Sequence, residues 1–257
     1  MKYAENQVDG QMEGEHISTF GCGNGIHHFY RTKNGYKIIF CALDGSLAGA
    51  LRSTPDFRHH TISLYSTEQH RAYALSNAIL AAFTFAAARH HILMVHASVV
   101  CCQNKGILFL GKSGTGKSTH SKLWLQYILG SELLNDDSAA VRIHENGEIL
   151  VYGTPWSGKT PCYKNKKCNV QAFVRLEQAA VNQIQQEDAI HAFSSLYGAT
   201  SQMAWNDALN EYNLATVEQV VLRKPVYLLH CLPDQAAAEL NFHTTLCADH
   251  HNSRSLN

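Results

Sequence analysis

The sequence predicts an α/β protein in which a mixed β-sheet domain follows a β-rich N-terminal region. Short apolar segments typical of strands fill residues 1–66, and beyond residue 91 such segments alternate with stretches typical of helices. Several of the later strands are separated by only two or three turn-forming residues, which favours antiparallel hairpins over a purely parallel sheet. We therefore expect a β-rich region at 1–66, a connecting helix at 67–91 and a larger α/β domain at 92–257.

Composition narrows the class of protein. Hydrophobic residues make up 45% of the 257 and charged residues 16%, as in globular proteins. Basic and acidic side chains number 21 each, so we expect no nucleic-acid partner, because such binding depends on excess positive charge. The most apolar stretch, 79–88, is too short to span a membrane, and the first ten residues lack the apolar run of a signal peptide. Eight cysteines without an evenly spaced framework indicate reduced thiols, so we expect a cytoplasmic protein with no membrane partner.

Turn and helix signals set the expected order of elements. Asn34 and Gly35 lie between apolar, β-prone arms and are predicted as the two positive-φ residues of a tight hairpin. The segment 67–90 is rich in Ala and Leu and contains neither Gly nor Pro, which predicts a helix. The remaining expected elements are strands at 92–100 and 106–111 joined by a hairpin at 103–105, a helix at 117–128, a strand–turn–strand unit at 131–153, a strand at 169–178, and helices at 199–213 and 234–246.

The strongest motif follows the apolar segment ILFL. The nine residues GKSGTGKST match the pattern G-x-x-x-x-G-K-[ST] at Gly111, Gly116, Lys117 and Ser118. Glycines let backbone N–H groups converge on a phosphate, and the helix that follows adds its positive end. Lys117 would reach the β- and γ-phosphates, and the Ser118 hydroxyl would ligate Mg²⁺. We therefore predict that ATP and Mg²⁺ bind here. The expected nucleotide-binding residues are Gly111, Ser113, Gly114, Thr115, Gly116, Lys117, Ser118 and Thr119.

Two adjacent carboxylates, Asp136 and Asp137, follow Lys117 by 19 and 20 residues. The intervening helix of about 12 residues would span about 18 Å, enough to bring residues 133–135 back beside the strand that leads into the loop. Adjacent residues of a strand point to opposite faces unless a bulge intervenes, so the two acids are expected to have different roles. One would ligate Mg²⁺ and the other would accept a proton from an attacking hydroxyl. The alternative is a solvated Asn-Asp-Asp-Ser turn.

The order of VHASVV, ILFLGKSGTGKST and LLNDDSAAV resembles the catalytic domain of the HPr serine kinase/phosphorylase family and its HPr-kinase-related relatives. These proteins share a core with ATP-dependent phosphoenolpyruvate carboxykinase. The resemblance covers about residues 92–177, a third of the chain. It implies that residues 92–257 form a P-loop kinase core that transfers a phosphoryl group from ATP to a hydroxyl, usually that of a serine.

The resemblance also implies roles for individual residues. Asp136 would be the general base, and Asp137 would be linked to the metal ion together with Ser118. His96 would lie near the transferred phosphate and act beside Lys117 as a catalytic residue.

The chain departs from the family in three respects. The arginine-containing loop that bacterial HPr kinases use for phosphorolysis has no match, and the first 90 residues do not resemble their usual N-terminal domain. The metal-binding lysine and histidine that carboxykinases carry before the loop have no match either. The acceptor is therefore left open among a protein, a peptide and free serine, and self-association is also left open. The alternatives are a non-catalytic ATP-sensing interaction module and, with less support, a carboxykinase-type lyase.

Two further segments carry candidate residues. The Gly- and Pro-containing loop 153–161 would either place Lys159 on a phosphate or acceptor or be an ordinary exposed loop. His243, Cys247 and His250 are spaced so that one helical face would hold them, as in some zinc sites. No second motif supports a zinc ion there, so we expect a frayed, polar C-terminus instead.

Overall fold

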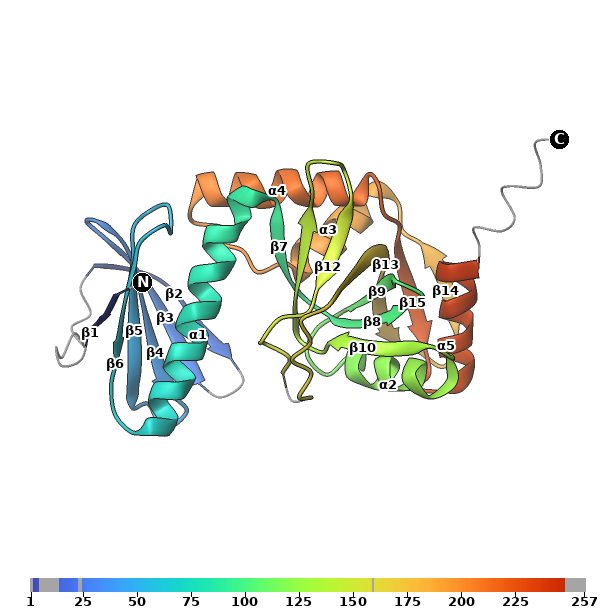
Figure 1. Ribbon diagram of the computed structural model, residues 1–257, viewed down its shortest axis with the longest axis horizontal. Helices are drawn as coiled ribbons and strands as arrows, with labels where there is room; N and C mark the ends of the chain where they lie inside the picture. Colours follow the sequence, from blue (N-terminus) through green and yellow to red (C-terminus); the bar gives the residue numbers. More distant parts are fainter. Residues whose placement is uncertain (1, 5–13, 23–24, 159, 248–257) are drawn as a thin grey trace. The chain divides into compact units, whose positions relative to one another are not determined.

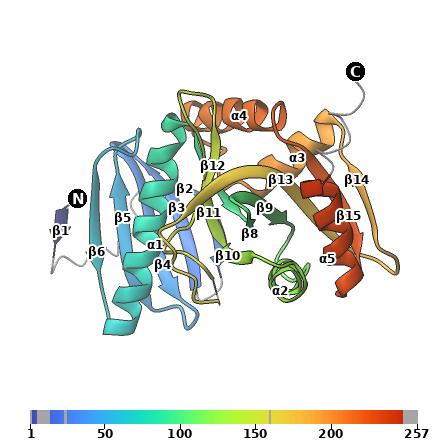
Figure 2. The ribbon, with the colours of Figure 1, turned by 45° about the vertical axis from the view of Figure 1, so that its right-hand side comes forward.

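The computed structural model describes residues 2–4, 14–22, 25–158 and 160–247. The chain divides into two compact units. Unit 1 comprises Met1–Ala87 and Met203–Leu209, and unit 2 comprises Ala88–Gln202 and Asn210–Asn257 (Figures 1 and 2). No helix in the described part of the chain combines the length and apolar character that a membrane crossing requires.

In the part of unit 1 that the structure describes, a helix covers one face of a six-stranded sheet (Figure 1). The strands follow the order β1-β6-β5-β4-β3-β2 and are antiparallel except for β1 and β6. Their bounds are β1 Lys2–Ala4, β2 Glu15–Cys22, β3 Gly25–Thr32, β4 Gly35–Ala42, β5 Leu47–Ser53 and β6 His60–Leu64, and the helix is α1, Glu68–Ala87. The β-rich N-terminal region expected from the sequence is thus present.

The helix predicted over 67–90 is confirmed as α1, which is followed by a 3-10 turn, η1, at Ala88–His90. Ala74, Ala78 and Ala82 lie one helical turn apart and are buried against the sheet. Their small side chains let the helix approach the sheet closely. At Gly49 of β5, an added Cβ would lie only 2.7 Å from the Ala74 Cβ. The segment expected to connect two regions therefore also supplies one layer of unit 1.

The N-terminal hairpin is present, but its turn lies one residue earlier than predicted. Lys33 and Asn34 form the turn, and Gly35 is already the first residue of β4, paired with Thr32. Gly35 has a φ of 140°, and a Cβ there would lie 2.0 Å from the carbonyl oxygen of Ser53 on the neighbouring strand. Glycine is therefore required by the close approach of β5 and not by the turn itself.

Unit 2 is built on a nine-stranded mixed sheet within the described residues. Its main path is β10-β8-β9-β13-β12-β11-β7, with β15 parallel to β13 and β14 pairing β15. The bounds are β7 Ile92–His96, β8 Ser98–Cys102, β9 Lys105–Leu110, β10 Ser131–Asn135, β11 Ser138–Ile143, β12 Ile149–Tyr152, β13 Lys167–Gln178, β14 Gln183–Gln186 and β15 Val226–Cys231. The predicted mixed sheet is confirmed, and so is the β8–β9 hairpin, whose turn residues Gln103 and Asn104 both have positive φ.

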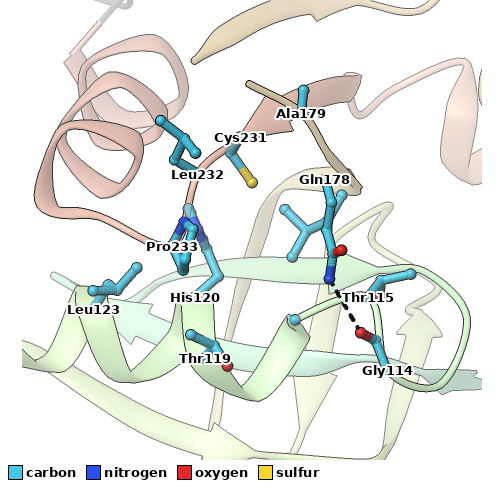
Figure 3. A pocket seen from close by; sticks show the side chains of 12 residues that line it. Gly114, Thr115, Thr119, His120, Leu123, Gln178, Ala179, Cys231, Leu232 and Pro233 are labelled. Atoms are coloured by element: carbon cyan, nitrogen blue, oxygen red, sulfur yellow. Dashed lines mark hydrogen bonds between the residues drawn. The ribbon is translucent and has the colours of Figure 1, made fainter. Parts of the chain in front are cut away.

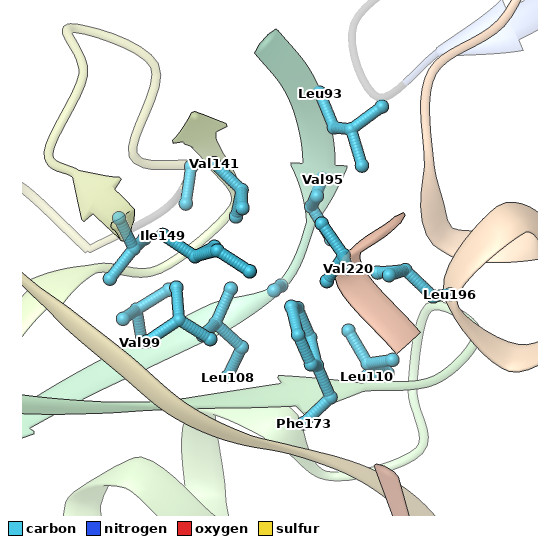
Figure 4. Close-up of a cluster of buried hydrophobic side chains, with 14 of the residues drawn as sticks. Leu93, Val95, Val99, Leu108, Leu110, Val141, Ile149, Phe173, Leu196 and Val220 are labelled. Carbon is cyan, nitrogen blue, oxygen red and sulfur yellow. The ribbon is translucent and has the colours of Figure 1, made fainter. Parts of the chain in front are cut away.

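Helices cover both faces of this sheet (Figures 1 and 2). They are α2 Lys117–Tyr127, α3 Ala189–Ala199, α4 Asp207–Val221 and α5 Gln235–Phe242, followed by the π-helical turn η2 at His243–Cys247. Leu196 of α3 and Val220 of α4 pack with Phe173 and other sheet residues in one apolar core (Figure 4). Trp124 of α2 and Ala238 of α5 belong to the core on the opposite face. The chain is therefore an α/β protein with a β-rich N-terminal region.

The helix predicted at 199–213 is wrong in position, because α4 begins only at Asp207, and α3 was not expected at all. The intervening chain is tied to the edge of the sheet. Thr200 forms a β-bridge with Val95, and the Ser201 amide donates to the carbonyl of Met94 at 2.8 Å. These long-range backbone bonds prevent the helix from starting at 199.

Removal of the cap of α5 is expected to destabilise unit 2 modestly. Asp234 Oδ1 accepts from the Ala237 amide at 2.9 Å and from Asn182 Nδ2 at 2.9 Å. Asp234→Ala should lower the free energy of unfolding by about 1 kcal/mol, measured by urea denaturation. Gln235→Ala, at the exposed next position, is the control and should change it by less than about 0.5 kcal/mol. Equal effects of the two substitutions would contradict the capping role.

Candidate functional site

The glycine-rich loop leads from β9 directly into α2. Gly111 has a φ of 144°, and a Cβ there would lie 2.5 Å from Thr115 Oγ1. That hydroxyl donates to the carbonyl of Lys112 at 2.9 Å, which closes the loop on itself. Gly116, with a φ of 105°, is the N-cap residue of α2. The two motif glycines are therefore required by the loop conformation, which few other residues could adopt.

The N-terminus of α2 lacks a side-chain cap. Asp188 and Asp234 accept amide hydrogen bonds at the starts of α3 and α5. Gly116 offers no such acceptor, and the first turn of α2 contains no acidic residue. The first N–H groups therefore receive no side-chain acceptor from the N-cap residue, which suits an anionic ligand such as a phosphate at the positive end of the helix dipole.

Lys117, the first residue of α2, is only 8% exposed. Its Nζ donates to the carbonyl oxygens of Gly111 at 2.7 Å and Lys112 at 3.3 Å, and it lies 3.1 Å from His96 Nε2. Burial lowers the pKa of the Lys117 ammonium, and the charges of Asp137 and Asp136 partly oppose that shift. The ammonium is thus held at the loop by acceptors that a phosphate could replace.

His96, the last residue of β7, links Lys117 to Asp137. Its Nδ1 lies 3.1 Å from Asp137 Oδ1, and the Ser138 hydroxyl donates to Asp137 Oδ2 at 3.1 Å. Burial acts to raise the pKa of Asp137, but the hydrogen bond and charge of His96, the Ser138 hydroxyl and the charge of Lys117 outweigh it, so the pKa lies below its usual value. The structure thus brings three of the predicted site residues into one chain of contacts.

Asp136 has different partners and is 9% exposed. Its Oδ1 accepts from the Ser98 hydroxyl at 2.6 Å, and Ser98 Oγ lies 2.6 Å from Ser121 Oγ on α2. Its Oδ2 accepts from Thr160 Oγ1 at 2.5 Å. The two neighbouring carboxylates are therefore engaged by separate sets of groups.

Asp136 and Asp137 have different partners because a two-stranded ribbon bends at these two residues. The alternation of side chains along a single strand is not the cause. β7 continues through Ala97 into β8, and β10 continues through Asp136 and Asp137 into β11. β7 pairs with β11 and β8 pairs with β10, while the Ala97 amide donates to the Asp137 carbonyl at 2.9 Å. We call Ala97, Asp136 and Asp137 the ribbon corner. The expectation that both acids lie on one strand is corrected by this bend.

The other predicted residues are placed as follows. Ser118 lies in the first turn of α2 and is half-buried. Ser113, Gly114 and Thr119 are exposed, and Thr115 is half-buried. The described residues contain no group of three or more His, Cys, Asp or Glu side chains suited to a metal ion.

Two predicted candidates lie outside the described residues. They are Lys159 and His250. The remaining members of the second candidate set, His243 and Cys247, are the first and last residues of η2.

A pocket of about 560 Å³ adjoins the glycine-rich loop (Figure 3). It lies at the carboxyl ends of the parallel strands β13 and β15, where α/β sheets commonly bind ligands. Gln178 Nε2 donates to the Gly114 carbonyl at 3.4 Å and thereby joins the pocket to the loop. The lining residues are Gly114, Thr115, Gly116, Thr119, His120, Leu123, Leu176, Gln178, Ala179, Cys231, Leu232 and Pro233.

His120 is the polar group buried in the wall of this pocket, at 2% exposure. Its ring packs edge-on against Phe109, with 4.8 Å between centroids, and its Nε2 has no partner among the described residues. Burial lowers the pKa of His120 to about 4, against the opposing charge of Asp234, so the imidazole is neutral at physiological pH. A buried nitrogen without a partner costs about 1–3 kcal/mol, which a ligand atom could recover only if the side chains that cover the nitrogen move aside.

Four residues of this region were not predicted: Ser98, Ser121, Thr160 and His120. Ser98 belongs to the VHASVV segment, two residues after His96, and its position there is the one signal that could have indicated it. The other three acquire their neighbours only through tertiary packing.

No family model matches the sequence, and no curated protein matches it either. Among solved structures, the HPr(Ser) kinase/phosphatase from Coxiella burnetii is similar to this chain, with 13% sequence identity and a TM-score of 0.35. The match covers 62% of this chain and 97% of that one.

Proposed function

We propose that the protein is a Mg²⁺- and ATP-dependent kinase that transfers the γ-phosphoryl group to the hydroxyl of a serine in a protein, in a peptide or free in solution. The observation that carries this proposal is the contact chain Lys117–His96–Asp137 next to the engaged carboxylate of Asp136. An uncapped helix and a buried lysine suit the phosphates, and an adjacent pair of carboxylates suits proton and metal binding.

The residues of the loop fit a nucleoside triphosphate. The first N–H groups of α2 would bind the β-phosphate, and Lys117 would exchange its carbonyl acceptors for β- and γ-phosphate oxygens. Ser118 and Asp137 would hold Mg²⁺, whose charge would offset that of the phosphates. The base and ribose would enter the pocket beside α2, where His120 Nε2 lacks a partner.

Asp136 would accept the proton of the attacking hydroxyl. A bond then forms between the acceptor oxygen and the γ-phosphorus, the bond from that phosphorus to the oxygen bridging the β-phosphate breaks, and ADP leaves. Lys117 and His96 would stabilise the charge on the transferring group, and Asp137 would orient the His96 ring. Such catalysis depends mainly on positioning and electrostatics.

The test is a calorimetric titration of the whole protein with ATP, with and without Mg²⁺, followed by a search for labelled phosphate on free serine and on serine-containing peptides. We expect saturable binding that Mg²⁺ strengthens, and transfer to one of these acceptors. Binding without any transfer would favour the alternative, an ATP-sensing module. An absence of binding would contradict both.

His120 supplies a second prediction, which concerns the nucleoside. His120→Phe keeps an aromatic ring against Phe109 but removes Nε2. We expect ADP binding to weaken about 3- to 10-fold, the value of one hydrogen bond, while tripolyphosphate binding stays unchanged. Calorimetry with both ligands measures the difference.

The melting temperature of the ligand-free variant is the control for this prediction. It should not fall, because the substitution removes a buried polar atom that has no partner among the described residues. If the affinities for ADP and for tripolyphosphate fell equally, the loop would be distorted. That result would contradict a contact between His120 and the nucleoside.

A further inference from the structure

Thr160 already places a hydroxyl on the carboxylate proposed as the base. Its Oγ1 donates to Asp136 Oδ2 at 2.5 Å, while Ser98 engages Oδ1. An acceptor hydroxyl must donate to this carboxylate before its proton can be removed. The chain's own threonine therefore occupies the position that the kinase proposal assigns to the acceptor.

The segment that carries Thr160 is held in place on its N-terminal side by the strand residues that flank the aspartates. Thr154 Oγ1 donates to the Ser138 carbonyl at 2.6 Å and accepts from Asn135 Nδ2 at 3.1 Å. The Trp156 carbonyl accepts from the Ser138 amide at 3.2 Å. A Cβ on Gly158 would lie 2.9 Å from the Asp137 Cβ, so the backbone itself runs against the acidic pair.

A further hydrogen bond holds the same segment on the C-terminal side of Thr160. The Cys162 amide donates to Ser157 Oγ at 3.1 Å, and both side chains are buried, at 6% and 2% exposure. Thr160 itself is half-buried. Hydrogen bonds made by residues on both sides of Thr160 therefore support the position in which its hydroxyl meets Asp136.

We propose that Thr160 is a phosphoryl acceptor of this protein, that is, a site of self-phosphorylation. This inference rests on the proposed kinase function. Thr160 Oγ1 forms a bond to the γ-phosphorus of ATP, and its proton passes to Asp136 Oδ2. The bond between that phosphorus and the oxygen bridging the β-phosphate breaks, and ADP leaves.

The product would not remain in place. A phosphothreonine carries a charge of about −1.5 to −2 at neutral pH and would lie beside the carboxylate of Asp136. Repulsion would displace residue 160 from Asp136, which frees the carboxylate for an external hydroxyl. Self-phosphorylation would thus occur once per chain and precede transfer to other acceptors.

The experiment incubates the whole protein with Mg²⁺ and ATP and follows its intact mass, then locates the added group by peptide fragmentation. We expect one phosphoryl group on Thr160, at a first-order rate that does not change with protein concentration, because the transfer is intramolecular. Thr160→Ser should still be modified, and Thr160→Val should not. Asp136→Asn, which leaves Thr160 intact, should lose the modification while it still binds ATP.

The outcomes separate this inference from the kinase proposal. Transfer to free serine or a peptide with Thr160 unmodified would overturn self-phosphorylation and leave the kinase proposal standing. Thr160 would then only orient Asp136. Phosphate on another residue alone, or a rate proportional to protein concentration, would also overturn the inference. An absence of ATP binding in the same samples would remove both proposals.

Discussion

Lys117→Met is expected to weaken ATP binding about 100-fold, because a charge-assisted hydrogen bond to phosphate contributes about 1.5–3 kcal/mol and more than one phosphate contact is lost. The side chain is 8% exposed and is already held at the loop by the Gly111 and Lys112 carbonyls. It thus reaches a bound phosphate with little loss of conformational freedom. Calorimetric titration with Mg²⁺ and ATP measures the change.

Lys122→Met is the matched control, since Lys122 lies on the same helix but is exposed. It should bind ATP as the wild type does. If Lys117→Met also bound ATP normally, or if both variants lost binding equally, nucleotide binding at this loop would be contradicted.

The same variant should change how stability depends on pH. Burial lowers the pKa of Lys117 below its ordinary value of 10.5, so between these two pKa values the unfolded chain binds more protons than the folded one. The free energy of unfolding of the wild type should therefore rise with pH in that window relative to that of Lys117→Met. Urea denaturation at several alkaline pH values tests the direction.

Asp136→Asn is expected to lower the rate of phosphoryl transfer about 100- to 10,000-fold, the usual contribution of a general base, while ATP binding is retained. The amide oxygen still accepts from one of the two hydroxyls, those of Ser98 and Thr160, and the amide NH₂ can donate to the other, but the group cannot take up a proton. Single-turnover transfer from labelled ATP measures the chemical step, and calorimetry measures binding.

Glu132→Gln is the control for this variant. Glu132 is a carboxylate on β10 as well, but it is paired with Lys164 and Lys166 at the surface. Its replacement should leave the rate unchanged. A transfer rate in Asp136→Asn close to that of the wild type would eliminate Asp136 as the base, whereas loss of ATP binding would point to a structural role.

Local signals in the sequence predicted much of the fold. The strand ILFL, the glycines after it and the helix that begins at Lys117 depend on near neighbours in the chain, and all three are present. The β8–β9 hairpin was predictable for the same reason. The start of α4 was not, because Thr200 and Ser201 are held by β7, which precedes them by about a hundred residues.

In the candidate site too, features set by near neighbours in the sequence were predictable and those set by distant residues were not. The spacing of Lys117, Asp136 and Asp137 predicted that the carboxylates return to the loop, and the resemblance placed His96 with them. The partners of each carboxylate depend on the ribbon corner, which follows a register shift between Leu133 and Asn135. No local pattern encodes a bend that two long-range pairings create, so the Ser98 and Thr160 hydroxyls could not be assigned to Asp136 from the sequence.

The ribbon corner also determines which parts of the site can move. Each arm on either side of Asp136 and Asp137 is hydrogen-bonded to a different strand, β8 on one side and β7 on the other. The backbone that carries the two carboxylates can therefore shift only if a strand pairing breaks, and such openings cost more free energy than the motions of exposed loops. If the protein is the proposed kinase, the adaptability that different acceptors require would come from side chains and loops that approach the corner, while the backbone of the acid pair stays in place.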